Sequence, residues 1–183
     1  MVYGFFDTNN YTFLKSVRIS SSTVINSRTK LKIKDGVWIW HHSVIDASNG
    51  ITIGEGCQIG AFVGIFTHSS HISIRLHGSD YMNVPVDDRI GYIRGSVEIG
   101  DYTFIGTGSF IFPGSRIGKG CIILAGTHVK GEVPDYSVVS GNPSKIIANV
   151  AQIDRMYLKE NKFLNQYFDP SLLEEMKRKH LKK

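Results

Sequence analysis

An aliphatic residue recurs at every sixth position over much of this chain, and this period constrains the fold more than any other feature. The longest run has seven members without a slip: Ile93, Ile99, Ile105, Ile111, Ile117, Ile123 and Val129. An amphipathic helix repeats at about 3.6 residues and a strand at two, so neither accounts for a period of six. A six-residue unit buries a core only when successive units stack. The sequence therefore predicts an all-β fold, a parallel β-helix.

A second set of positions supports this register. Four residues after each aliphatic stands a small or β-branched side chain: Val97, Thr103, Ser109, Ser115, Cys121, Thr127 and Val133. The register also occurs earlier in three shorter blocks: Ile19, Ile25 and Leu31, with Thr23 and Thr29 at the small positions; Ile33, Ile39 and Ile45; and Ile53, Ile59 and Ile65. Many of the 19 glycines fall between these positions, where turns are needed. Cys57 and Cys121 both occupy the inward small position, so we expect buried thiols.

Breaks in the register divide the chain into parts. We expect residues 1–16 to form an N-terminal cap, residues 17–148 a β-helix domain, and residues 149–183 a helical tail. Within the tail, Asp169 followed by Pro170 is a typical helix start. A long excursion, residues 67–92, interrupts the repeat, and such loops on a rigid scaffold often carry function.

Charge and composition exclude some functions. The net charge is +5, but residues 176–183 hold five Lys and Arg and no acid, so the rest of the chain balances sixteen basic against sixteen acidic residues. The charge therefore does not indicate a nucleic-acid partner. No apolar run reaches 18 residues, and residues 1–10 lack the pattern of a signal peptide. With only two cysteines, these observations predict a cytoplasmic protein without a transmembrane segment.

Four motifs, together with the repeat, resemble the hexapeptide-repeat acyltransferases over residues 17–148. They are Thr-His-Ser-Ser-His (67–71), Ile-Gly-Asp-Tyr-Thr-Phe-Ile-Gly-Thr-Gly (99–108), Ala-Gly-Thr-His-Val-Lys-Gly-Glu-Val-Pro (125–134) and Ser-Gly-Asn-Pro-Ser-Lys-Ile-Ile (140–147). The chain looks most similar to the sugar O-acetyltransferase branch, which includes maltose and galactoside acetyltransferases and enzymes of bacterial surface polysaccharides. The resemblance implies a left-handed coil, a homotrimer with active sites in the clefts between subunits, acetyl-CoA as cosubstrate and a carbohydrate acceptor.

Acetyl transfer to a sugar hydroxyl needs a general base, because the hydroxyl is a poor nucleophile at neutral pH, and histidine is the usual base. His68 and His71 stand at the start of the excursion. Compared with the family motif, a one-residue insertion makes His71 the better match and His68 the second candidate. The other histidine of the pair would then hold the loop by hydrogen bonding.

Three further residues are candidates for substrate binding. His42 corresponds to a polar family position that contacts substrate, or it is an exposed turn residue. Asp46 can orient a histidine, accept a hydrogen bond from a sugar hydroxyl, or cap its own turn. Arg75 belongs to the mixed charges of the excursion, which suit either plain solvation or an acidic acceptor.

For the acetyl-CoA donor, the resemblance implies contacts along one edge of the coil. The implied residues are Thr107, Gly108, Ala125, Gly126, Lys130 and Lys145. Thr107 matches a family serine near the thioester, where a hydroxyl or a neighbouring N–H can stabilise an oxyanion. Lys145 matches a basic residue near the CoA phosphates. Lys130 is displaced by one place from the family's lysine.

Other readings stay open at this point. N-acetylation of an amino sugar needs the same base and donor. A γ-type carbonic anhydrase would use His41 or His42 with His68 and His71 on zinc, but their spacing and the Gly-Asn-Pro-Ser-Lys motif fit it poorly, so no metal is expected. A non-catalytic scaffold is a third reading. Trp38 and Trp40 flank an inward aliphatic and should point outward, toward an interface, a ligand or the N-terminal cap.

Overall fold

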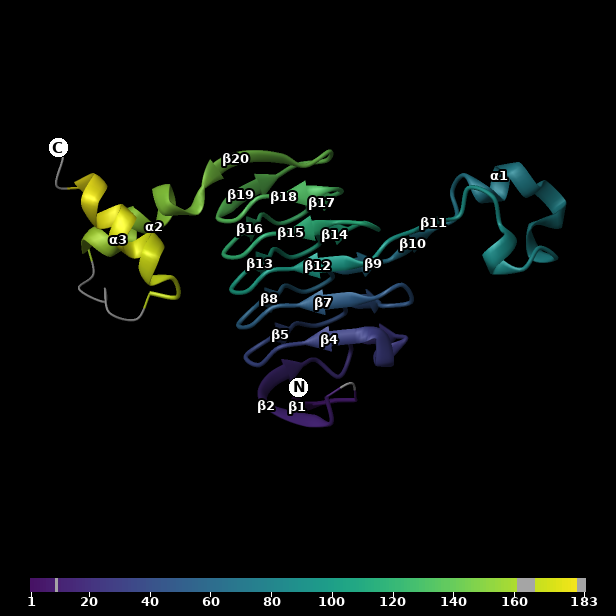
Figure 1. Cartoon of the computed structure of the whole chain (residues 1–183), viewed down its shortest axis with the longest axis horizontal. Coiled ribbons are helices and arrows are strands. Elements are labelled where there is room, and N and C mark those ends of the chain that lie inside the picture. Colours follow the sequence, from purple (N-terminus) through teal and green to yellow (C-terminus); the bar gives the residue numbers. More distant parts are fainter. Residues whose placement is uncertain (9, 161–166, 181–183) are drawn as a thin grey trace.

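The chain folds into a three-sided parallel β-helix whose coils stack in chain order (Figure 1). The structure is a computed structural model that describes residues 1–8, 10–160 and 167–180. Each coil contributes one short strand to each of three sheets, and neighbouring strands within a sheet are mostly parallel. The coil predicted from the repeat is therefore present.

The three sheets are each built from strands that recur at about the same point of successive coils. The first sheet holds β1 (Val2–Asp7), β2 (Thr12–Ile19), β5 (Trp38–Ile39), β8 (Gln58–Ile59), β13 (Phe104–Ile105), β16 (Ile122–Ile123), β19 (Ser137–Ser140) and β20 (Lys145–Asn149). The second holds β3 (Val24–Asn26), β6 (Val44–Asp46), β9 (Gly64–Phe66), β14 (Phe110–Ile111) and β17 (His128–Val129). The third holds β4 (Leu31–Ile33), β7 (Ile51–Ile53), β12 (Val97–Ile99), β15 (Arg116–Ile117) and β18 (Glu132–Val133).

The repeat positions form the core. Ile105, Ile111 and Ile123 are fully buried, and the small positions also point inward. Small polar side chains there bond to the adjacent coil: the hydroxyl of Thr103 donates to the carbonyl of Gly118 at 2.8 Å. Cys57 and Cys121 are buried free thiols, as predicted.

Two repeat assignments are wrong. Ile93 lies in β11 (Ile93–Arg94), outside the coil, because the excursion does not end until after this strand. Thr29 is exposed within η1 (Arg28–Lys30), a 3-10 turn inserted at one corner of the coil. In both cases the local loop extends past the point where the six-residue spacing resumes.

Turns join the sheets at three corners, and the turns of successive coils stack by backbone hydrogen bonds. Corner 1, between the first and second sheets, contains residues 41–42, 61–62, 107–108 and 125–126; for example, Gly126 N–H donates to the Thr107 carbonyl at 2.9 Å. Corner 2, between the second and third sheets, contains residues 47–49, 67 and 112–114. Corner 3, between the third and first sheets, contains residues 35–36, 55–56, 101–102, 119–120 and 135–136.

The two ends of the coil are covered differently. At the N-terminal end, β1 and β2 form an antiparallel hairpin whose last residues join the first coil. At the other end the chain leaves the coil through α2 (Val150–Glu160) and α3 (Pro170–His180). Asp169 caps α3 as predicted, because its Oδ1 accepts the backbone N–H groups of Ser171 and Leu172 at 2.9 and 3.1 Å. No helix among the described residues has the length and apolar character needed to cross a membrane.

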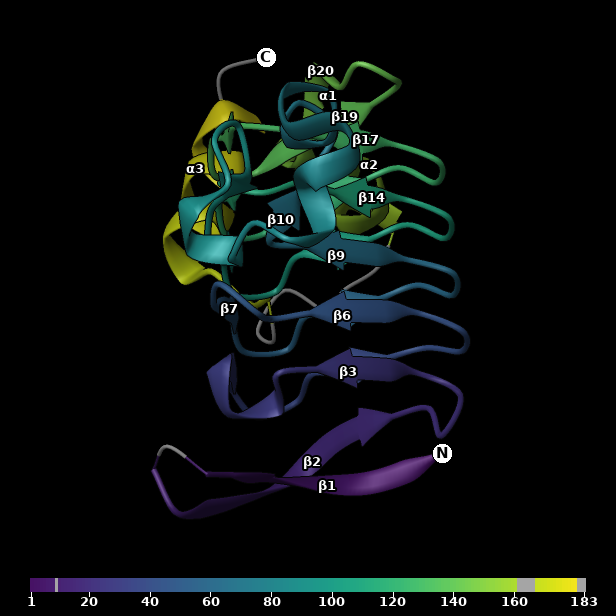
Figure 2. The same cartoon turned by 90° about the vertical axis from the view of Figure 1, so that its right-hand side faces the viewer.

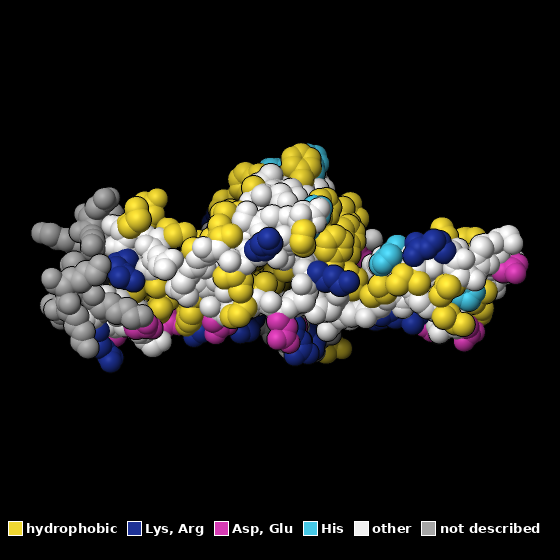
Figure 3. Space-filling view, turned by 90° about the horizontal axis from the view of Figure 1, so that it is seen from above, with side chains coloured by type: hydrophobic (Ala, Val, Ile, Leu, Met, Phe, Trp, Pro, Cys, Tyr) yellow, Lys and Arg dark blue, Asp and Glu magenta, His cyan; other side chains and the backbone are white. Residues whose placement is uncertain are grey.

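The excursion projects from corner 2. Its base is a two-stranded antiparallel stalk, β10 (His68–Ser69) with β11. Beyond the stalk the chain forms α1 (Ser73–His77), η2 (Gly78–Met82) and η3 (Val86–Asp88). The excursion and the helical tail extend from opposite sides of the coil (Figures 1 and 2). Seen from above, they form two arms beside the central coil (Figure 3).

Candidate active site

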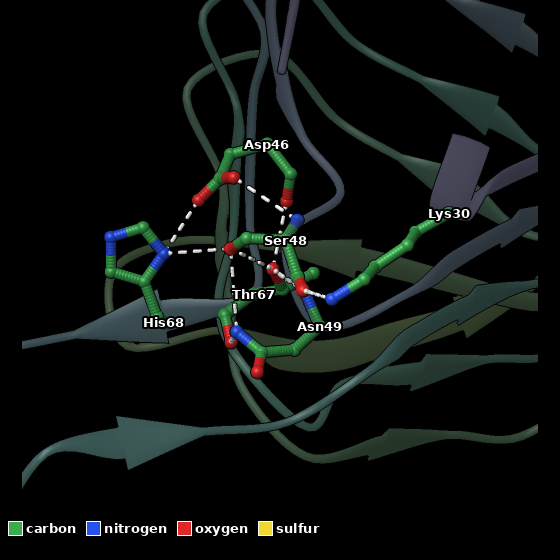
Figure 4. Close-up of polar contacts among 6 residues, drawn as sticks. All are labelled: Lys30, Asp46, Ser48, Asn49, Thr67 and His68. Atoms are coloured by element: carbon green, nitrogen blue, oxygen red, sulfur yellow. Dashed lines mark hydrogen bonds and ion pairs between the residues drawn. The ribbon is translucent and has the colours of Figure 1, made fainter. Parts of the chain in front are cut away.

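A histidine and a buried aspartate meet at corner 2 (Figure 4). Nδ1 of His68 lies 2.7 Å from Oδ2 of Asp46, and Asp46 is almost fully buried. The His68 side chain is 38% exposed, so part of the ring faces solvent. Asp46 ends β6 and His68 follows β9, its neighbour in the sheet, so the parallel register brings both to one edge.

Polar neighbours hold this pair in place. Ser48 Oγ lies 3.1 Å from His68 Nδ1 and 3.1 Å from the Thr67 hydroxyl. The Thr67 hydroxyl donates to the Asp46 carbonyl at 2.9 Å and accepts the Asn49 backbone N–H at 2.9 Å. The Ser48 N–H donates to Asp46 Oδ1 at 3.2 Å, so the aspartate caps its own turn with one oxygen and faces the histidine with the other. Two of the roles considered for Asp46 therefore coexist.

An aromatic ring packs on the histidine. Tyr92 stacks on His68 with ring centroids 5.6 Å apart and an interplanar angle of 10°. The Arg94 guanidinium lies over the Tyr92 ring, 5.0 Å from its centroid. Partial burial raises the pKa of the Tyr92 phenol. The stack fixes the ring plane of His68 while its Nδ1 is held by Asp46.

His71 and Arg75 belong to the excursion beyond the stalk. His71 is exposed, and its Nδ1 lies 2.7 Å from the Ser69 hydroxyl. The Arg75 guanidinium donates to the His71 carbonyl. His71 lines a hollow of about 220 Å³ together with Lys130, which follows β17. The structure thus brings His71 and Lys130 together at the same side of the coil as His68.

Four of the predicted donor contacts lie at corner 1 instead. They are Thr107, Gly108, Ala125 and Gly126. Gly108 and Gly126 both have φ of +70°, and a Cβ built on either would meet nothing within 4 Å. Lys145, in β20, is exposed near the end of the same sheet.

His42 is also at corner 1, away from His68. Its ring stacks on Phe62 with centroids 5.2 Å apart, and its backbone N–H donates to Ser22 Oγ at 3.1 Å. Corners 1 and 2 stand at opposite ends of the second sheet's strands. The five steps from Phe62 to Thr67 span roughly 16 Å at about 3.3 Å per residue. Within one chain, the residues of corner 1 are therefore far from His68.

Comparison with known proteins identifies the family. A putative acetyltransferase of Saccharomyces cerevisiae, YJL218W, is 34% identical over 128 residues, 69% of this chain and 59% of that protein. A putative lipopolysaccharide biosynthesis O-acetyl transferase of Escherichia coli, WbbJ, is 33% identical over 116 residues, 62% of this chain and 57% of that protein. The solved structure of a hexapeptide-repeat containing acetyltransferase of Vibrio cholerae, VCA0836, matches with a TM-score of 0.63 at 23% identity. The chain belongs to the hexapeptide-repeat acetyltransferase family.

The family fold extends over most of the chain. VCA0836 covers 74% of this chain, which covers 71% of VCA0836. A galactoside acetyltransferase in complex with coenzyme A matches with a TM-score of 0.65 at 19% identity, over 85% of this chain and 68% of that one. No protein-family model matches the sequence. The chain spans 40% to 59% of the length of curated relatives such as YJL218W, WbbJ and the probable acetyltransferase Rv3034c of Mycobacterium tuberculosis.

Some residues around His68 and Asp46 were not predicted from the sequence. Tyr92, Ser48 and Asn49 have no chemical signature of their own. The closing of the stalk and the corner brings Tyr92 and Ser48 to His68, and Asn49 to Thr67. Asp46, in contrast, was among the predicted residues, and it ends a strand one coil before the Thr-His motif. Among the described residues, no three His, Cys, Asp or Glu side chains gather closely enough to hold a metal ion.

Proposed function

We propose that this protein is an acetyl-CoA-dependent O-acetyltransferase that acts on a sugar hydroxyl. In this proposal each active site is formed by two copies of the chain. The observation that carries the proposal is the pairing of His68 with the buried Asp46 at 2.7 Å. The relatives support it, because those named above are described as acetyltransferases and WbbJ as an O-acetyl transferase of lipopolysaccharide biosynthesis. A surface glycan or its precursor is the corresponding acceptor.

His68 acts as the general base in this proposal. A carboxylate at Nδ1 favours the tautomer that carries its proton there, which leaves the Nε2 lone pair to accept a proton. As the acceptor hydroxyl loses its proton to Nε2, its oxygen attacks the thioester carbonyl carbon. The tetrahedral intermediate then expels CoA by breaking the C–S bond, and the proton on Nε2 passes to the thiolate.

We assign this role to His68 rather than to His71, although the motif spacing favours His71. His68 has a buried carboxylate on one nitrogen and a stacked ring on its face, as a positioned base requires. His71 has the Ser69 hydroxyl beside Nδ1 where His68 has a carboxylate, and His71 is exposed. His71 and Lys130 share a hollow, which suits them to contact the donor or the acceptor.

The donor contacts at corner 1 imply that two copies form each site. Thr107, Gly108, Ala125 and Gly126 are roughly 16 Å along the sheet from His68, whereas an attacking oxygen must come within about 3.5 Å of the thioester. Corner 1 of one copy facing corner 2 of the next removes this gap. We therefore propose a homotrimer of left-handed coils with acetyl-CoA in the clefts between copies, as the family resemblance implies, and Lys145 near the CoA phosphates. The free thiols suit a cytoplasmic enzyme.

A complementation experiment tests the function and the composite site together. His68→Ala removes the base, and Gly126→Trp fills the open space at corner 1. Each variant alone is expected to release CoA from acetyl-CoA slowly in the presence of sugar acceptors. Coexpressed copies regain activity, because some clefts combine an intact His68 with an intact corner 1. Mixed trimers that stay inactive would contradict the composite site.

The chemistry needs a separate readout. We expect free thiol to appear in proportion to acetyl ester on the sugar, with His68→Ala much slower than His71→Ala. An amide product on an amino sugar, with no ester, would show that the enzyme is an N-acetyltransferase and not an O-acetyltransferase. CoA release at an unchanged rate in His68→Ala would show that His68 is not the general base.

A further inference from the structure

The chain's two tryptophans lie side by side at the surface next to corner 1. Trp38 is in β5 and Trp40 follows it, and their ring centroids are 5.0 Å apart with an interplanar angle of 45°. They line a hollow of about 240 Å³ in the face of the first sheet. We call this the tryptophan hollow; its walls are Trp38, Trp40, Gln58, Ala61, Phe104 and Thr107.

The walls of the tryptophan hollow combine apolar ring faces with polar groups. Trp40 and Phe104 are 39% and 45% exposed, although large aromatic side chains are costly to leave in water. Gln58 provides an amide and Thr107 a hydroxyl, each able to donate and accept hydrogen bonds. A sugar ring has the matching chemistry, because its C–H groups present an apolar face and its hydroxyls ring the edge.

The N-terminal hairpin does not fill the tryptophan hollow. The Arg18 guanidinium of β2 lies 5.4 Å from the Trp38 ring centroid and 5.5 Å from that of Tyr3, so the cap packs along Trp38. No residue of the hairpin is among the walls of the hollow, and Trp40 and Phe104 in those walls stay exposed. The cap thus holds Trp38 in place, and a preformed wall of this kind reduces the ordering that a ligand must provide.

Aromatic rings continue from the tryptophan hollow around corner 1. Trp40 is 5.1 Å from His41, and His42 stacks on Phe62 at 5.2 Å, all measured between ring centroids. His41 is fixed by the Ser20 hydroxyl, 2.7 Å from its Nδ1. This row of rings is longer than one sugar unit, so it suits an oligosaccharide better than a monosaccharide.

We infer that the tryptophan hollow is a glycan-binding subsite, in which a sugar ring of an oligosaccharide acceptor stacks on Trp40. Its placement supports this, because Thr107 lines the hollow and also belongs to the proposed donor contacts at corner 1. A sugar in the hollow therefore lies beside the position expected for the thioester. The assignment of the bound sugar as acceptor rests on the proposed function, whereas stacking of a glycan on Trp40 does not.

Intrinsic fluorescence provides a direct test, because Trp38 and Trp40 are the only tryptophans in the chain. The full chain carrying His68→Ala, which is expected to slow turnover, is titrated with maltotriose, lactotriose and triacetylchitotriose. We expect a saturable change in tryptophan emission with at least one of them. Trp40→Ala abolishes saturable binding measured by calorimetry, and Trp40→Phe retains it because a ring remains. Tyr11→Ala, at an exposed aromatic residue of the hairpin, leaves binding unchanged.

Kinetics of the active enzyme separates this inference from the proposed function. Trp40→Ala should raise the acceptor KM roughly tenfold, about 1.4 kcal/mol, and leave the acetyl-CoA KM unchanged. If the protein binds a glycan saturably through Trp40 but transfers no acetyl group, the subsite is supported and the proposed O-acetyltransferase function is contradicted. No emission change with any of the three glycans would overturn the subsite. So would emission that depends only on protein concentration, which would mean that a second copy covers the hollow.

Discussion

Oδ2 of Asp46 faces Nδ1 of His68 at 2.7 Å, across the boundary between two successive coils. The carboxylate is buried, and its other oxygen accepts the Ser48 N–H. A histidine held in this way has its Nδ1 paired with a carboxylate, while its side chain stays 38% exposed. The pair therefore links the register of the β-helix to the chemistry proposed at corner 2.

Replacing either partner should slow acetyl transfer without unfolding the coil. His68→Ala is expected to lower kcat on the order of 10²- to 10⁴-fold, the usual contribution of a general base. Asp46→Asn should lower kcat by at least about tenfold, because the amide no longer favours the tautomer with a free Nε2. Initial rates of CoA release measure both, and Asp80→Asn, at an exposed carboxylate of η2, is the control. Full activity of Asp46→Asn would show that Asp46 caps its own turn but does not orient His68 for catalysis.

The coil was predictable because its spacing is local. Ile105 and Ile111 are buried as the six-residue period requires, and only positions beside enlarged loops, Ile93 and Thr29, departed from it. The site was less predictable. The stacking of Tyr92 on His68 depends on how the 23 residues between them fold back, and no short-range pattern encodes that closure. Motif spacing also cannot show that Thr107 and His68 stand at different corners.

Two glycines separate a packing role from a ligand role. A Cβ on Gly106 would lie 2.5 Å from the backbone nitrogen of Ala125 in the next coil. Gly106→Ala should therefore lower the free energy of unfolding by about 1–3 kcal/mol, as overpacking does. Gly108→Ala meets no atom but keeps φ at +70°, which costs about 1–2 kcal/mol in an L-residue. Only Gly108→Ala is expected to raise the acetyl-CoA KM. Urea unfolding and steady-state rates distinguish the two, and equal donor KM values would remove Gly108 from the donor contacts.

Asp169 anchors the helical tail to corner 3. Its Oδ2 accepts the Tyr136 hydroxyl and lies 2.9 Å from Lys119 Nζ, while its Oδ1 accepts hydrogen bonds from Ser171. These bonds, that of the Ser171 hydroxyl first, hold the pKa of Asp169 well below its usual range. The folded state then binds fewer protons than the unfolded state, so this stabilisation is complete above about pH 4 and declines as the pH falls below it.

The corresponding experiment compares the wild type with Asp169→Asn. Urea unfolding near pH 6 should show a loss of about 1 kcal/mol for the variant, the usual cost of weakening a helix cap. The difference should shrink as the pH falls from 5 toward 2. Asp80→Asn is the control, because it removes an exposed carboxylate in η2 of the excursion, outside the helical tail. A difference that is independent of pH would contradict the role assigned to the ionised Asp169.

Burial of Cys57 leads to a prediction about the free energy of unfolding at alkaline pH. Burial is the main cause that raises the pKa of its thiol to about 11, and the side chain is fully inaccessible to solvent. The unfolded state releases this proton near pH 9, whereas the folded state retains it until about pH 11. The folded state thus binds more protons in between, and the free energy of unfolding should fall by up to about 1.4 kcal/mol per pH unit over that window.

The measurement must isolate this thiol from other groups that titrate at high pH. Urea denaturation from pH 8 to 11 follows the free energy of unfolding of the wild type and of Cys57→Ala. We expect the wild-type value to fall relative to that of the variant as the pH rises. Near pH 8 the difference between the two should change little with pH, because the thiol is mostly protonated in both states. Native Cys57 should also resist alkylation by iodoacetamide, since the thiolate is the reactive form and burial suppresses it. Rapid alkylation of Cys57 in the folded protein at pH 8 would show that the coil opens at this position.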